Sequence, residues 1–245
     1  MAVHSVLVPV DFGDESARAV AVGGAIAARC SHATLTLLHA ESIEAPAYFT
    51  AEQLNDLERQ RRATTAQAEE FLSRFGRQHT TAPFVGTVDR HSAVDAILAA
   101  AASADLVVMG THGRHGPKRW WLGSVAERVL RDIATPLLIV RAGDGGAASA
   151  DHVFDRTLVH ASGRLRGETA LAFAREMAGC FGGIVTDERY GLIEPSLERT
   201  RATVLVAAVP QPRTPGWMSN YGEPLVRFCT VPMLFVPEVT EGVLR

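Results

Sequence analysis

The sequence predicts an α/β protein: an open parallel sheet with helices on both faces, followed by a second, shortened copy of the same fold. Short apolar runs rich in branched residues alternate with helical segments through the first half. Similar runs recur in the second half, and a stretch of small residues separates the two. Strands separated by helices need crossover connections, which make neighbouring strands parallel. A chain of 245 residues is long enough for two such units.

Five buried strands are expected in the first half. Each is a short apolar run of the kind that parallel strands covered on both faces require. These runs are residues 5–10, 34–39, 83–88, 105–110 and 136–141. Helices are expected between them, at residues 14–30, 50–79, 92–102 and 124–133.

The second half is predicted to repeat the first weakly. Its counterparts of the first strand, first helix, fourth strand and fifth strand are residues 156–161, 167–180, 203–209 and 231–236. Residues 184–201 are too few for the long helix and the third strand, so this copy is shortened. The expected division is a first domain at 1–143, a small-residue linker at 144–151 and a second domain at 152–245.

Composition excludes several classes of protein. The formal net charge of −3 argues against binding nucleic acid, which needs a basic surface. No apolar run approaches the roughly 18 residues of a membrane span, and the N-terminus lacks the features of a signal peptide. A cytoplasmic protein that binds no membrane is therefore expected. Cys30, Cys180 and Cys229 are scattered and odd in number, so we expect buried apolar thiols rather than a disulfide framework.

A glycine-rich loop follows the predicted fourth strand. The strand ends at Gly110, Gly113 and Gly116 lie in the loop, and a helix begins at Gly123-Ser124. Glycines let backbone N–H groups approach an anion, and the first turn of a helix offers unpaired donors. This is the layout of a phosphate site. Its spacing fits neither the Walker P-loop nor the dinucleotide fingerprint.

The spacing Gly110-x2-Gly113-x9-Gly123-Ser124 resembles the ATP signature of the universal stress protein family. The segment Val8-Pro9-Val10-Asp11 is similar to that family's first strand and its adenosine-binding aspartate. Residues 123–130 and 135–140 resemble the family's closing helix and strand. The resemblance covers all five strands of the first half and implies the sheet order 3-2-1-4-5.

The resemblance also implies a site, because strands 1 and 4 flank the switch point where open α/β sheets bind ligands. Asp11 would accept hydrogen bonds from the ribose, with Met109 near ribose and base. The residues lining adenine would be Pro9, Val10 and Ala40. The residues holding the phosphates would be Gly110, Gly113, Gly123, Ser124 and Val125. ATP is the expected ligand, with ADP and AMP as alternatives and Mg²⁺ bound through the phosphates; no catalytic residue and no metal-ligating side chain is assigned.

The second half is expected to have lost this site. Ser162 stands at the position of Asp11, and Ala207 or Ala208 replaces Gly110. The loop that follows carries Pro210, Pro212 and Pro215, which lack N–H donors for a phosphate.

Structural alternatives exist for the main candidates. Ser124 and Glu127 form the S-x-x-E pattern of a capping box, and Asp11 could cap the helix that follows it. His112 and His115 suggest a metal at first sight, but no carboxylate or cysteine joins them at ligand spacing.

The resemblance favours a nucleotide-responsive regulator in stress response. One alternative is a slow ATPase or nucleotidyl-transfer enzyme of related fold, for which His112 and His115 are the candidate bases. Another is a scaffold whose site is vestigial. The two halves are expected to pair through their last strands, 136–140 and 232–236, as an intramolecular pseudo-dimer. Trp120 and Trp121 are candidates for a further homodimer contact.

Overall fold

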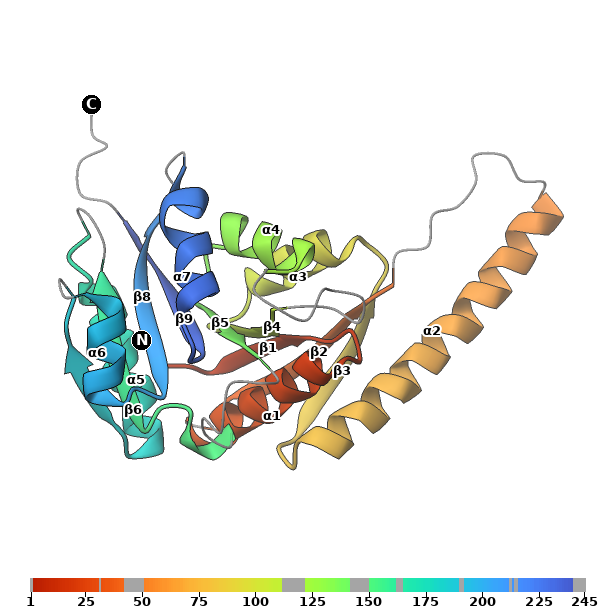
Figure 1. Cartoon of the computed structure of the whole chain (residues 1–245). Helices are drawn as coiled ribbons and strands as arrows, with labels where there is room; N and C mark the ends of the chain where they lie inside the picture. Colours follow the sequence, from red (N-terminus) through yellow and green to blue (C-terminus); the bar gives the residue numbers. More distant parts are fainter. Residues whose placement is uncertain are drawn as a thin grey trace.

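The protein forms one continuous sheet of nine strands within the described part of the chain, in the order β3-β2-β1-β4-β5-β9-β8-β6-β7 (Figure 1). The computed structural model describes residues 2–30, 32–41, 51–111, 122–141, 150–161, 165–189, 192–211, 213 and 216–239. Residues 144–149, which are most of the predicted linker at 144–151, therefore lie outside the described residues.

The first half has the predicted alternation of strands and helices. Its elements are β1 (Ser5–Pro9), α1 (Asp14–Arg29), β2 (Thr34–Ala40), α2 (Ala51–His79), β3 (Phe84–Asp89), α3 (Ala93–Ala101), β4 (Leu106–Gly110), α4 (Ser124–Asp132) and β5 (Leu137–Val140). The strands pair in parallel in the predicted order 3-2-1-4-5. In β5 every residue is buried, which explains its uninterrupted apolar sequence.

The second half is the predicted shortened copy. Its elements are η1 (Ala150–His152), β6 (Arg156–Ala161), α5 (Glu168–Phe181), β7 (Ile184–Asp187), α6 (Ile193–Thr200), β8 (Val204–Gln211), η2 (Met218–Gly222), α7 (Glu223–Phe228) and β9 (Met233–Val239). The strands β7, β6, β8 and β9 are parallel to one another. A single short helix, α6, leads from β7 to β8, so within the described residues the counterparts of α2 and β3 are missing.

The two halves meet where β5 pairs with β9. This pair is antiparallel, with Leu137 opposite Phe235, Leu138 opposite Leu234 and Ile139 opposite Met233. The contact expected between the two last strands is therefore present, and it extends the sheet across both halves. One buried core lies under α1, α2 and α5, and the other lies on the opposite face under α3, α4, α6 and α7.

Cys30 and Cys180 form a disulfide across the two halves, with their Cα atoms 5.2 Å apart. Cys30 is the C-terminal cap of α1, and Cys180 lies in the last turn of α5. The expectation of unpaired thiols is wrong for these two residues, because α1 and α5 contact each other although the cysteines are 150 positions apart. Cys229 is a buried free thiol, as expected.

Candidate functional site

The predicted site lies where three neighbouring parallel strands end. Pro9 ends β1, Ala40 ends β2 and Gly110 ends β4. Because β1 pairs in parallel with both β2 and β4, these three ends lie at one edge of the sheet. The helix that follows β1 covers one face and the helix that follows β4 covers the other. This edge is therefore the switch point of the sheet, where open α/β proteins form a crevice.

Asp11 holds the turn between β1 and α1. Its Oδ1 accepts a hydrogen bond from the N–H of Gly13 at 3.0 Å and a short one from the Ser16 hydroxyl. The N–H of Asp11 donates in return to the Ser16 hydroxyl at 3.0 Å. The alternative that Asp11 supports the start of the helix is thus realised through these contacts, although the N-terminal cap itself is Gly13. A carboxylate accepts about four hydrogen bonds, so a ribose contact remains compatible with this role.

Phe12 is a site residue that the sequence analysis missed. Its φ of 66° lies in the left-handed region, which costs about 1–2 kcal/mol for a residue with a side chain. The Phe12 ring packs against His39, with centroids 4.5 Å apart, and edge-on against Phe71 and Phe75 of α2. This packing offsets the strain and ties the Asp11 turn to α2. No sequence pattern marked it, because the four aromatic residues lie on three separate segments.

His39 fastens β2 to the same turn. Its Nδ1 lies 2.8 Å from the carbonyl oxygen of Val10. A carbonyl oxygen only accepts, so Nδ1 carries the proton and donates. The backbone that presents Asp11 is therefore held by α1, α2 and β2 together.

Gly110 is required by the packing of α1. A Cβ at this position would lie 2.6 Å from the Cβ of Glu15. The next residue, Thr111, is buried and its hydroxyl donates to Oε2 of Glu15 at 2.6 Å. The absence of a side chain at Gly110 thus has a packing reason that is independent of any phosphate.

The glycine-rich loop is closed at its base by one backbone hydrogen bond. The N–H of Gly123 donates to the carbonyl oxygen of Thr111 at 2.6 Å, which brings the start of α4 to the end of β4. Ser124 is the first residue of α4 and is exposed, and Val125 is half-buried. The capping box is absent: Gly123 caps α4 without a side-chain bond, and Glu127 instead pairs with Arg131 at 2.6 Å.

The structure brings most of the predicted site residues to this edge. Those at the strand ends are Pro9, Val10, Asp11, Ala40, Met109 and Gly110, and those at the start of α4 are Gly123, Ser124 and Val125. The side chains of Val10 and Met109 are buried in cores on opposite faces of the sheet. Residues 112–121 lie outside the described part of the chain, and with them Gly113, His112, His115, Trp120 and Trp121. Among the described residues, no group of three or more His, Cys, Asp or Glu side chains could hold a metal ion.

The corresponding edge of the second half is filled by its own side chains. The Glu238 carboxylate accepts hydrogen bonds from the N–H groups of Gly167 and Glu168 at 2.8 and 3.1 Å. These are the donors at the N-terminus of α5, the end of a helix that favours an anion. Arg189 covers the ends of β6 and β7: its Nε pairs with Asp187 at 2.8 Å and its carbonyl oxygen accepts from Ala161. Ser162 lies outside the described residues.

An open parallel sheet that has helices on both faces and a topological switch point between β1 and β4 defines a doubly wound α/β protein. Residues 2–141 match the model of the universal stress protein family, which is more than half of the chain, and the chain belongs to that family. None of the described helices is both long and apolar enough to cross a membrane.

The chain is also similar to individual proteins. The universal stress protein MJ0531 of Methanocaldococcus jannaschii is 55% identical over 38 residues, which are 16% of this chain and 22% of that protein. The match thus spans about a fifth of that relative's length. A solved universal stress protein from Archaeoglobus fulgidus covers 97% of this chain and 99% of its own, at 17% identity and a TM-score of 0.64. Another, solved in complex with cAMP, covers 58% of this chain and 100% of its own, at 28% identity and a TM-score of 0.42.

Proposed function

We propose that this chain binds an adenine nucleotide, preferably ATP, at the carboxyl ends of β1 and β4 and acts as a nucleotide-responsive regulator in stress response. The observation that carries the proposal is the hydrogen bond from Gly123 to Thr111, which holds the start of α4 at the end of β4, the strand that pairs with β1. In this arrangement Asp11 binds the ribose and the first N–H groups of α4 bind the phosphates. Mg²⁺ would be held through phosphate oxygens.

We propose one nucleotide per chain. The first half, residues 1–143, carries the site, the linker is 144–151, and the second half, 152–245, completes the sheet as the partner of an intramolecular pseudo-dimer. In the second half the helix that corresponds to α4 is α7, and its first turn carries Pro224, which has no N–H donor for a phosphate. The start of α5, the counterpart of α1, is occupied by the carboxylate of Glu238, whose negative charge also disfavours a phosphate at this edge.

The first experiment identifies the ligand. Full-length protein is denatured after purification, and the small molecules released are analysed by mass spectrometry. Titration calorimetry with ATP, ADP and AMP then gives the number of sites and their order of affinity. We expect one site per chain with ATP bound most tightly; two equivalent sites, or no binding of any adenine nucleotide, would refute the proposal. Phosphate release by the same samples separates a binding protein from a slow ATPase.

The second experiment tests the role of Asp11. In Asp11→Asn a side-chain oxygen still accepts from Gly13, so the turn persists while the charged contact to the ribose is lost. The affinities for adenosine and for ATP should fall by the same factor, about tenfold, because the lost contact is to the sugar that both ligands share. Unchanged adenosine affinity beside weakened ATP would place Asp11 at the phosphates instead.

A further inference from the structure

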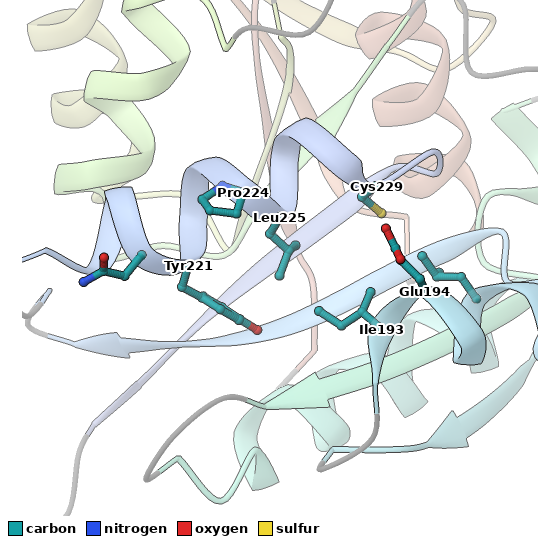
Figure 2. Close-up of a pocket in the computed structure, with 8 residues that line it drawn as sticks. Ile193, Glu194, Tyr221, Pro224, Leu225 and Cys229 are labelled. Carbon is teal, nitrogen blue, oxygen red and sulfur yellow. The ribbon is translucent and has the colours of Figure 1, made fainter.

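A pocket of about 210 Å³ lies in the second half, between α6 and α7 (Figure 2). It is remote in sequence from the proposed nucleotide site, and no residue of that site lines it. Its apolar lining comes from both helices and from the residue that ends α7: Ile193, Leu197, Leu225 and Cys229.

The pocket arises from the shortening of the second copy. The order of elements makes α6 the counterpart of α3, because each leads into the second-to-last strand of its copy. In the same way α7 is the counterpart of α4, because each leads into the last strand. In the first half α3 packs directly against α4, each with 9 residues. In the second half α6 has 8 residues and packs against β6, while α7 has only 6 and follows the irregular turn η2. Space that helix packing fills in one copy is left open in the other.

One wall of the pocket is an aromatic ring with a fixed orientation. Tyr221 lies nearly parallel to the ring of His160, with an interplanar angle of 24° and centroids 6.1 Å apart. Trp217 lies on the same aromatic cluster, 6.3 Å from Tyr221. The base of the pocket is formed by Leu225 and Cys229, which are buried in the core. The walls are therefore set by tertiary packing before any ligand binds.

The charge at the pocket is negative. Glu194 of α6 lines it, and in Figure 2 its carboxylate is directed toward Cys229 at the end of α7. Glu194 has no ion-pair partner among the described residues, and the lining residues include neither lysine nor arginine. A cation or a neutral molecule is thus accepted, and an anion is disfavoured.

The size of the pocket limits the ligand to a single ring with a short substituent. A cavity of about 150 Å³ lined by apolar side chains is enough to bind benzene. A ring placed against Tyr221 and Leu225 would gain apolar burial and an aromatic contact. An ammonium group on a short arm would then reach Glu194. We propose that this pocket is a binding site for small arylalkylamines, in which a short alkyl arm joins a single aromatic ring to a protonated amine.

The test uses three probes of one size on the full-length protein: benzylamine, benzyl alcohol and benzoate. Binding is measured by ligand-observed NMR with and without saturating ATP. We expect benzylamine to bind most tightly, benzyl alcohol more weakly and benzoate not at all. ATP should not displace benzylamine, because the two sites share no residue. Benzoate binding as tightly as benzylamine, or competition by ATP, would overturn the proposal.

Two variants separate charge from shape. Glu194→Gln should lower the affinity for benzylamine about two- to fivefold at low salt, which is the range for an exposed ion pair. The affinity for benzyl alcohol should not change. The matched control is Glu198→Gln. Glu198 is an exposed glutamate on the same helix and does not line the pocket, so this variant should change the affinity for neither benzylamine nor benzyl alcohol. Leu197→Trp should fill the pocket and abolish binding of both probes, with folding checked by thermal unfolding. Unaltered benzylamine binding in Glu194→Gln, or retained binding in a folded Leu197→Trp, would contradict the assignment.

Discussion

Arg213, from the second half, donates a hydrogen bond at 3.2 Å to the carbonyl oxygen of Ile133, the residue that ends α4 in the first half. Its guanidinium also reaches Leu130 and lies 4.9 Å from the ring of Trp217. Arg141 of the first half makes the reciprocal contact, donating to the carbonyl oxygens of Val226 and Cys229 at the end of α7. Cations favour the C-terminal ends of helices. Each half therefore supplies an arginine that caps a helix of the other half.

Arg213→Ala is expected to lower the free energy of unfolding by about 1–3 kcal/mol, because it leaves carbonyl groups at the end of α4 without their charged donor. Burial lowers the pKa of Arg213 to about 10, so the side chain is still charged at neutral pH. Urea unfolding of the variant measures the loss. The control is Arg175→Ala, an exposed arginine of α5, which should change stability by less than about 0.5 kcal/mol. Equal stability of both variants would show that the cap contributes nothing.

Gly123→Val and Gly110→Ala should affect different properties. Gly123 has φ −61°, which any residue adopts, so its valine variant should fold normally. The valine would block the approach of phosphates and reduce ATP affinity at least tenfold, or about 1.4 kcal/mol. Gly110→Ala places a Cβ against Glu15 and should lower the unfolding temperature even without nucleotide. Calorimetry and thermal unfolding of both variants measure the two effects; normal ATP binding by Gly123→Val would show that the phosphates lie elsewhere.

Loss of the disulfide between Cys30 and Cys180 should lower stability by about 2–4 kcal/mol, since the cross-link restricts the unfolded chain. Cys180→Ser and chemical reduction should give the same shift in the unfolding midpoint. Cys229→Ser, which replaces the buried free thiol and keeps the disulfide, is the control: reduction should shift its unfolding midpoint as much as that of the unaltered chain, whereas Cys180→Ser should not respond to reduction. Peptide mapping of unreduced protein that found Cys30 and Cys180 both free would contradict the pairing.

Acid should destabilise the fold in part through His160. Burial lowers the pKa of this imidazole below its ordinary value of 6.5, and a backbone hydrogen bond with Glu188 only partly opposes the shift. As the pH falls through 6.5, the unfolded chain takes up this proton before the folded chain does. The contribution of His160 to stability is thus complete above that pH and is lost below it. Urea unfolding from pH 7.5 to pH 5 should show a smaller loss of stability for His160→Gln than for the unaltered chain; an identical pH dependence would exclude this role.

The sequence predicted the fold of the first half well because buried parallel strands are short apolar runs, and these were recognisable at all five strands. It predicted the shortened second copy because the chain between residues 184 and 201 is too short for the missing elements. The candidate site residues at the ends of β1, β2 and β4 were predicted from the glycine spacing and from the resemblance to the universal stress protein family that this spacing supports. The alternative of a capping box at Ser124 and Glu127 is not realised, because Glu127 pairs with Arg131 one turn along α4 instead.

The sequence by itself thus determined the order of elements in the first half, the parallel direction of the strands within each half and the edge at which the candidate site lies, since these depend on local pattern and strand topology. Tertiary structure alone decided which distant residues meet. It paired Cys30 with Cys180, placed Glu238 on the N-terminus of α5, packed Phe12 against α2 and left a pocket between α6 and α7. These contacts join residues on separate elements, so they depend on how helices pack on the sheet and leave no signal at fixed spacing along the chain.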